Sequence, residues 1–103
     1  MKRGEIRWYK FLPPDKKRPI LILTRDSVLE YLGEVTIAPI TTTVRNIPSE
    51  VFLSKVDGLA QDCAVNCDHL QTVPKKKIGP LITFLPPSKM IEVGRAIRFA
   101  LNI

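Results

Sequence analysis

The sequence is poor in the residue types that many enzyme centres and metal sites use, since its 103 residues include one histidine and two cysteines. A single histidine excludes a reaction in which two histidines serve as acid and base. Cys63 and Cys67 are four positions apart, so on one strand both would face the same side but lie too far apart to bridge easily. We expect both thiols to be reduced, as in cytoplasmic proteins, and we expect no metal or other cofactor, because His69 is the only further soft ligand.

Long apolar runs are also absent, and no stretch approaches the ~20 apolar residues of a membrane-spanning helix. The first residues lack the apolar core of a secretion signal. We therefore expect a cytoplasmic protein with no membrane partner. No internal repeat, low-complexity tract or linker divides the chain, so residues 1–103 are predicted to form a single domain, long enough to bury about two thirds of its unfolded surface.

Acidic residues are outnumbered by basic ones. Ten Asp and Glu stand against 16 Lys and Arg, which gives a formal net charge of +6 at pH 7. Such an excess favours an anionic partner, either a nucleic acid or an acidic protein segment. The charge alone does not choose between these two classes of partner.

The rest of the chain is organised around residues 19–23, a run of leucine and isoleucine that begins with a proline. The run is too short for a helix and predicts a strand that is buried on both faces. Pro39 predicts a bend or an edge near the end of another strand, and Gly58 predicts a turn with positive φ. Other strands are predicted at residues 5–11, 34–41 and 50–53. Residues 63–73 are predicted to be the longest extended segment, and residues 81–85 a last strand or a bend.

Two helices are predicted. Asp26 or Ser27 is expected to cap a short helix over residues 28–32, and Ser88 a longer C-terminal helix that ends near residue 101. Apolar residues at helical spacing are expected to pack this helix against the sheet: Met90, Val93, Ile97, Ala100 and Leu101. The predicted fold class is mainly β (α+β), a small twisted β-barrel or half-barrel with a C-terminal helix and one or two short helices.

Basic and polar side chains occupy the ends of the predicted strands. Lys17 and Arg18 precede the buried strand, and Arg25 follows it. Guanidinium groups held by a rigid strand are suited to phosphate recognition. We expect the concave face of the barrel to carry the polar ends of three strands, with Lys17, Arg18, Thr41, Thr42, Asp68, His69 and Gln71.

Five segments, in this order and with fitting gaps, resemble the MazF/PemK family of toxin endoribonucleases: residues 18–25, 38–43, 47–51, 58–59 and 68–73. The opening residues 2–6 are similar as well, so the resemblance covers nearly the whole chain. It implies an SH3-like β-barrel, a homodimer, and sequence-specific, metal-independent cleavage of single-stranded RNA as the toxin of a type II toxin-antitoxin system. It also implies a protein partner, a MazE-like antitoxin that is acidic and partly disordered.

The resemblance places the family's catalytic Arg at Arg18 and its catalytic Ser or Thr at Thr41. Attack by a ribose 2′-OH needs a base, a proton for the leaving oxygen and cations against the developing charge, so Arg18 and Thr41 suit the scissile phosphate. Asp68 matches an acidic position of related toxins and is the first candidate base, and His69 is the second. The predicted RNA contacts are Lys16, Lys17, Arg25, Thr42, Ile47, Asn66, His69 and Gln71.

The sequence departs from the family at two places. The loop between the first two strands is cut to residues 13–17, so the choice of RNA sequence is expected to differ. Asn66 stands where some relatives have an Arg, so an acid-base role of that Arg does not transfer. Purely structural roles stay open for two residues: Asp68 as a turn or ion-pair carboxylate, and His69 as a satisfied polar side chain.

Two other functions also stay open. A catalytically silent RNA-binding module of SH3-like fold would keep the basic groove but would not need Arg18 and Thr41 together. A gyrase-poisoning toxin of the same fold resembles a chain that ends in Trp-Gly-Ile, whereas this chain ends Leu101-Asn102-Ile103. The missing Trp argues against the gyrase poison, and RNA cleavage would separate the enzyme from the silent module.

Overall fold

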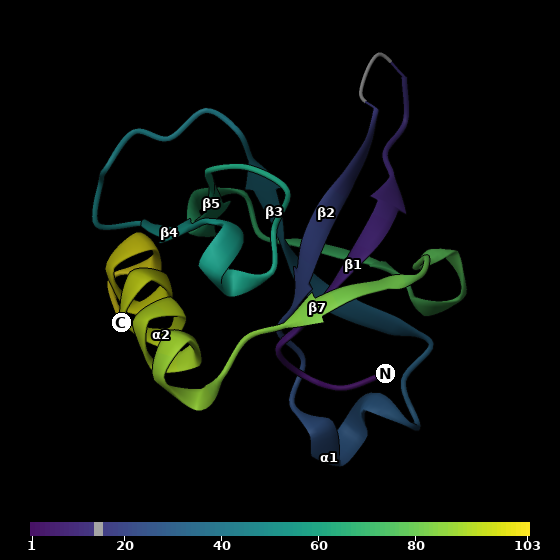
Figure 1. Cartoon of the computed structure of the whole chain (residues 1–103). Coiled ribbons are helices and arrows are strands. Elements are labelled where there is room, and N and C mark those ends of the chain that lie inside the picture. The colour runs from purple at the N-terminus through teal and green to yellow at the C-terminus, as the bar shows by residue number, and fades with distance from the viewer. Residues whose placement is uncertain (14–15) are drawn as a thin grey trace.

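A computed structural model describes residues 1–13 and 16–103 (Figure 1). Pro14 and Asp15 of the predicted first loop lie outside the described residues. The strands are β1 (Glu5–Lys10), β2 (Lys17–Ile22), β3 (Glu34–Thr41), β4 (Glu50–Leu53), β5 (Cys63–Asn66), β6 (Gln71–Pro74) and β7 (Leu81–Phe84). The helices are α1 (Asp26–Leu29) and α2 (Pro87–Leu101), and three 3-10 turns are η1 (Lys55–Asp57), η2 (Cys67–His69) and η3 (Lys75–Lys77).

The strands form one curved antiparallel sheet in the order β4-β5-β3-β2-β1-β7, with β6 also on β3. Two strands share one side of β3: β6 pairs with residues Glu34 to Ile37, and β5 pairs with Ile40 and Thr41. Pro39 lies between these two pairings, so the expected irregularity at this proline is a change of partner. The sheet is a half-barrel with α2 along one side (Figure 1), which confirms the predicted fold class.

The central strand β2 is buried on both faces, as predicted. Leu21 packs into a core cluster that includes Ile6 of β1 and Val93 of α2. Ile20 and Ile22, whose side chains point the other way, belong to a second cluster on the opposite face. None of these three β2 side chains has measurable exposure, so the strand is a fixed support for the polar residues at its start.

The predicted single strand over residues 63–73 is wrong. The chain forms β5, then the 3-10 turn η2, then β6. The cause is local, because the Oδ1 of Asn66 accepts a hydrogen bond from the backbone N–H of Asp68, at 3.0 Å, and caps the turn. Asp68 and His69 therefore lie on a turn between two strands that pair with different parts of β3. Cys67 lies on the same turn, and both cysteines are buried and free.

The two helices begin differently from the prediction. Neither is capped by a side chain: α2 begins at Pro87 after Pro86, and Ser88 lies inside its first turn. Proline suits this position because it has no N–H to leave unpaired and its φ already matches the helix. In α1, Asp26 accepts a hydrogen bond from the backbone N–H of Arg3 instead of capping the helix.

The stripe that packs α2 onto the sheet is largely as predicted. Val93 is fully buried, and Met90, Ile97 and Ala100 are partly buried against the same core cluster. Leu101 is an exception, because it is 53% exposed at the end of the helix. The predicted stripe also missed Ala96, which is buried in the same core cluster.

Candidate active site

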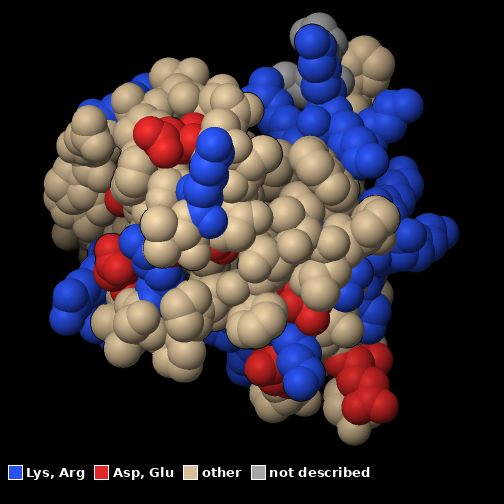
Figure 2. All heavy atoms as spheres, viewed as in Figure 1, with Lys and Arg blue, Asp and Glu red and all other residues tan. Residues whose placement is uncertain are grey.

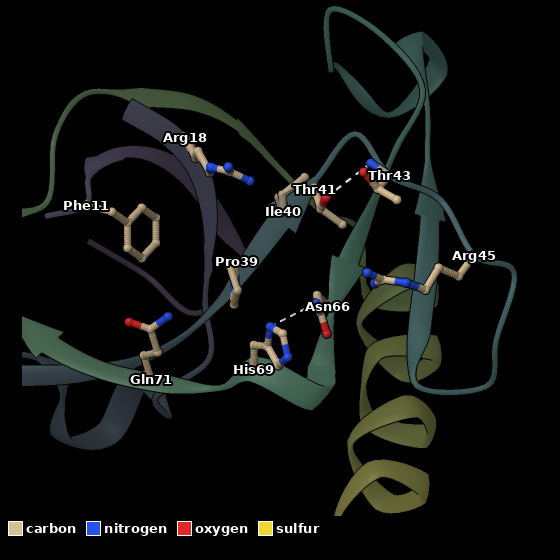
Figure 3. Close-up of a pocket in the computed structure, with 10 residues that line it drawn as sticks. All are labelled: Phe11, Arg18, Pro39, Ile40, Thr41, Thr43, Arg45, Asn66, His69 and Gln71. Carbon is tan, nitrogen blue, oxygen red and sulfur yellow. Dashed lines mark hydrogen bonds between the residues drawn. The ribbon is translucent and has the colours of Figure 1, made fainter. Parts of the chain in front are cut away.

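A pocket of about 280 Å³ opens where β2, β3 and the β5–β6 turn meet (Figure 3). We call it the Arg18 pocket. Arg18 and Phe11 enter it from the β1–β2 side, Arg45 reaches in from the loop after β3, and His69 and Gln71 come from the β5–β6 side (Figure 3). Its ten lining residues are Phe11, Arg18, Pro39, Ile40, Thr41, Thr43, Arg45, Asn66, His69 and Gln71.

Arg18 reaches this pocket because of its place in β2. It pairs with Tyr9 of β1 and lies on the same face of the strand as Ile20, whereas Lys17 faces the other way. Its side chain is exposed while the residues that follow it are buried, so the guanidinium is held at the rim of a rigid strand. A guanidinium in this position can present two N–H groups to a phosphate.

Thr41 is the last residue of β3 and is half-buried at the pocket. Its hydroxyl oxygen accepts a hydrogen bond from the backbone N–H of Thr43, at 3.1 Å. That bond uses the oxygen as acceptor and leaves the hydroxyl hydrogen to donate to a ligand. Pairing with Ala64 of β5 fixes the backbone below it.

Arg45 is a pocket residue that the sequence analysis missed. Its backbone N–H donates to Glu50 Oε1 at 2.9 Å, and its guanidinium Nη1 lies 3.3 Å from Oε2 of the same carboxylate. The Glu50 side chain is only 2% exposed, whereas that of Arg45 is 54% exposed. The buried carboxylate thus anchors an accessible cation. A basic residue four positions after Thr41 was the available signal in the sequence.

Phe11 also lines the pocket. Its ring packs edge-on against Tyr9, with the two ring centroids 4.9 Å apart. Both residues also border the core cluster on this face of the sheet. An aromatic ring at the edge of a pocket can stack on a planar ligand group such as a nucleobase.

Three polar residues from the β5–β6 region complete the pocket. Asn66 is 6% exposed, and its Nδ2 lies 3.3 Å from Nδ1 of His69 (Figure 3). His69 itself is exposed on the turn, and Gln71 is exposed at the start of β6. The structure therefore brings together five of the predicted site residues, Arg18, Thr41, Asn66, His69 and Gln71.

Six predicted site residues do not line the pocket: Lys16, Lys17, Arg25, Thr42, Ile47 and Asp68. Asp68 accepts a hydrogen bond from the hydroxyl of Ser49, at 2.5 Å, and Lys17 lies over the Trp8 ring, 5.2 Å from its centroid. Arg25 directly precedes α1, beyond the far end of β2 and about 20 Å of extended chain from Arg18. Arg18 and Arg25 therefore do not contribute to the same site.

The charge around the pocket is positive. Its lining holds two arginines and no acidic residue among the described side chains. Figure 2 shows basic side chains gathered over the end of the β1–β2 hairpin and along the adjoining edge, and acidic ones in several separate groups, one of them near α1. The described residues contain no group of three or more His, Cys, Asp or Glu side chains that could hold a metal ion. No described helix is long and apolar enough to cross a membrane.

The nearby thiol of Cys67 is not a nucleophile at neutral pH. Burial, with further contributions from the carboxylates of Asp68 and Glu50, raises the pKa of Cys67 to about 11. Burial also raises the pKa of Cys63, again with help from nearby carboxylates. Since the thiolate is the reactive form, both thiols are inert at neutral pH.

Residues 2–101 match a family described as the PemK-like, MazF-like toxin of type II toxin-antitoxin systems. The chain is similar to Endoribonuclease MazF3 of Mycobacterium tuberculosis, with 45% identity over 89 residues that cover 86% of each chain. It is also similar to Probable endoribonuclease MazF2 of the same organism, with 36% identity over 99 residues and 95% of each chain.

Solved structures share the whole fold. The Mycobacterium tuberculosis toxin MazF-mt6 has a TM-score of 0.88 at 41% identity, covering 96% of this chain and 97% of that one. An endoribonuclease from a mycobacterial species, solved with its cognate antitoxin, also has a TM-score of 0.88, at 26% identity and with 100% and 96% coverage. Both similarities span the strands and turns that form the Arg18 pocket.

Proposed function

The chain belongs to the PemK-like, MazF-like toxin family of type II toxin-antitoxin systems, and we propose that it is an endoribonuclease that cleaves single-stranded RNA at specific sequences without a metal ion. Two relatives that match most of the chain carry the name endoribonuclease. One observation from the structure supports this proposal most directly: Arg18 and Thr41 line a single basic pocket.

The proposed reaction is attack of a ribose 2′-OH on the adjacent phosphorus. A new O–P bond forms, the bond to the 5′-oxygen of the next nucleotide breaks, and the product carries a 2′,3′-cyclic phosphate. The 2′-OH loses a proton and the departing 5′-oxygen gains one. Negative charge builds on the phosphate oxygens in between, which is where preorganised cations lower the barrier.

Three pocket residues have proposed roles in this reaction. Arg18 binds the phosphate through two N–H groups and stabilises the negative charge that develops on its oxygens. It also lies where it can donate a proton to the leaving 5′-oxygen. Thr41 donates its hydroxyl hydrogen to a phosphate oxygen, because its oxygen is already held by the N–H of Thr43. Arg45, anchored by Glu50, binds a neighbouring phosphate and so keeps the RNA strand in position along the pocket.

The geometry does not favour Asp68 as the base. Its carboxylate accepts a hydrogen bond from the hydroxyl of Ser49, and its backbone N–H donates to Asn66 Oδ1. Both hydrogen bonds stabilise the η2 turn. We assign it a positioning role. An Asp68→Asn variant is then expected to lose stability while keeping most of its rate when folded, whereas loss of cleavage in a fully folded variant would restore Asp68 as the base.

The proposal is tested by incubating the purified protein with a long single-stranded RNA in EDTA, with ends mapped by primer extension. Arg18→Ala and Thr41→Ala are compared with wild type. Discrete cuts with wild type alone, ending in a cyclic phosphate, are the expected result. RNA that is bound but never cut by any of the three would contradict it and indicate a silent RNA-binding module.

Two protein contacts belong to the same proposal. A homodimer and an acidic, partly disordered antitoxin are expected, acting in the cytoplasm where the RNA is. One structural relative was solved with its cognate antitoxin, and an acidic segment is complementary to a chain of net charge +6. Light scattering at micromolar concentration tests the dimer, since a monomer at that concentration would contradict it.

A further inference from the structure

The side-chain amide of Asn66 has both of its ends assigned by its partners. Its Oδ1 accepts from the backbone N–H of Asp68 at 3.0 Å, and a backbone N–H can only donate. The amide is therefore oriented with Nδ2 toward His69, where it lies 3.3 Å from Nδ1. Asn66 is 6% exposed and ends β5, where it pairs with Glu50, so this orientation is held by buried structure.

The orientation of Asn66 decides where the proton of His69 lies. Nδ2 of an amide donates and cannot accept, so Nδ1 of the imidazole must be the acceptor and carries no hydrogen. The neutral ring then has its hydrogen on Nε2. No hydrogen bond joins Nε2 to another residue in the part of the chain that the structure describes, and the residue is exposed at the Arg18 pocket.

We infer that Asn66 is a positioning residue that fixes the His69 tautomer with its hydrogen on Nε2, and that this Nε2–H donates to an acceptor atom on an RNA base. The inference rests on the proposed function for its substrate. It removes His69 from the candidates for the general base, because Nδ1 is occupied by Asn66 and Nε2 already holds its hydrogen. His69 thus contributes to the choice of sequence rather than to the chemical step.

A base edge is the acceptor that the surroundings favour. The cations of the pocket, Arg18 and Arg45, supply the contacts that phosphates need, whereas His69 presents an Nε2–H donor in the same pocket as the amide of Gln71. Neutral amide and imidazole groups are typical readers of the exposed edges of single-stranded bases. Phe11, on the other side of the pocket, offers a ring on which such a base can stack.

The tautomer is tested on the protein without RNA, by nitrogen NMR of the imidazole at mildly alkaline pH. His69 is the only histidine, so its ring signals need no assignment. Wild type is expected to show a protonated Nε2 and an unprotonated Nδ1. Asn66→Asp replaces the donor with an acceptor and is expected to move the proton to Nδ1, while Asn102→Asp, the same change at the far end of α2, leaves it on Nε2. A protonated Nδ1 in wild type, or no change in Asn66→Asp, would overturn the inference.

The second measurement compares cleavage of an RNA library by wild type and His69→Ala. Loss of one hydrogen bond to a base should relax selectivity at a single position of the recognition sequence by about tenfold, with the other positions unchanged. An equal loss over all sequences would mean that His69 contacts a phosphate and would overturn the base assignment. If wild type cuts no RNA, the proposed function fails, but the NMR result still decides the tautomer.

Discussion

Two pockets of the same volume, about 280 Å³ each, meet at Ile40 and differ in almost everything else. Seven of the ten residues that line the Arg18 pocket are polar or charged. In the second pocket, which we call the Trp8 pocket, only Lys17 and Gln61 are polar or charged. Its nine lining residues are Trp8, Lys17, Pro19, Ile40, Leu59, Ala60, Gln61, Cys63 and Ile82.

The difference arises from the two-residue period of one strand. Arg18 points into one pocket, while its neighbours Lys17 and Pro19 point into the other. A shift of one residue in the register of β2 would exchange their contents. Volume therefore does not identify the functional site here. Charge and convergent polar groups distinguish the two, because they are more numerous in the Arg18 pocket than in the Trp8 pocket.

The largest expected effect is the difference in cleavage rate between substitutions of Arg18 and of its neighbour Lys17. Arg18→Ala should lower the rate of RNA cleavage by about 10² to 10³, the usual cost of removing one preorganised contact to the developing charge. Lys17→Ala removes a cation one position away that faces the Trp8 pocket, and should change the rate by less than about threefold. Single-turnover cleavage at saturating enzyme checks both. Equal losses in the two variants would mean that the pockets share the substrate.

Truncation of Ile40 tests how much the side chain between the two pockets contributes to the stability of the fold. It is 2% exposed and lines both, so Ile40→Ala should lower the free energy of unfolding by about 3 kcal/mol. Urea denaturation measures this loss. Phe52→Ala is the matched control, because Phe52 is 46% exposed on β4 and its truncation should cost less than about 1 kcal/mol. Similar losses in the free energy of unfolding for the two variants would show that the residues around Ile40 can fill the space that its side chain leaves.

Thr41→Val keeps the β-branched shape and removes the hydroxyl from the Arg18 pocket. Loss of one hydrogen bond to the phosphate should slow cleavage by about tenfold to 30-fold. The backbone N–H of Thr43 also loses its acceptor, but it is exposed and water can replace it. Thr72→Val, at an exposed threonine on β6, is the control and should leave the rate unchanged. A Thr41→Val enzyme of wild-type rate would remove Thr41 from the mechanism.

Arg45→Ala should act on binding more than on rate. If Arg45 binds one phosphate, its loss should raise the KM several-fold and reduce the dependence of log Kd on log salt by about 0.7. Glu50→Gln should have a smaller effect in the same direction, because the amide retains an acceptor but holds the guanidinium less firmly. Titrations of RNA at several salt concentrations measure both. An unchanged slope in Arg45→Ala would show that this arginine is only structural.

Much of the framework could be predicted from the sequence because it follows from period and composition. The run from Pro19 to Leu23 is apolar on both faces, and it forms the strand with no exposed residue at its centre. The positive φ of Gly58, at 95°, follows from a turn that only glycine adopts freely. The bounds of β3 and β4 were also predicted correctly.

The main errors arise from side-chain hydrogen bonds, which the pattern of apolar residues does not reveal. A continuous strand over residues 63–73 fits the pattern of apolar residues, yet the amide of Asn66 captures the N–H of Asp68 and turns the chain. The same turn moves Asp68 away from the pocket and toward Ser49. Arg45 was missed because its anchor, Glu50, is identified only by burial of its carboxylate.

The two thiols provide the smallest effect and test whether the Trp8 pocket admits small molecules. Cys63 lines that pocket, whereas Cys67, whose pKa burial raises to about 11, lines neither. Below a pH of about 9 both thiols are protonated in the folded and unfolded states, and the stability linked to Cys67 is complete. As the pH rises from about 9 toward 11, the Cys67 thiol of the unfolded state loses its proton first, so the free energy of unfolding should fall.

Native alkylation at the lower end of this range should modify Cys63 before Cys67, as mass spectrometry of the two peptides would show. Modification of Cys67 first would mean that the β5–β6 turn, and with it the Arg18 pocket, opens more readily than the apolar pocket.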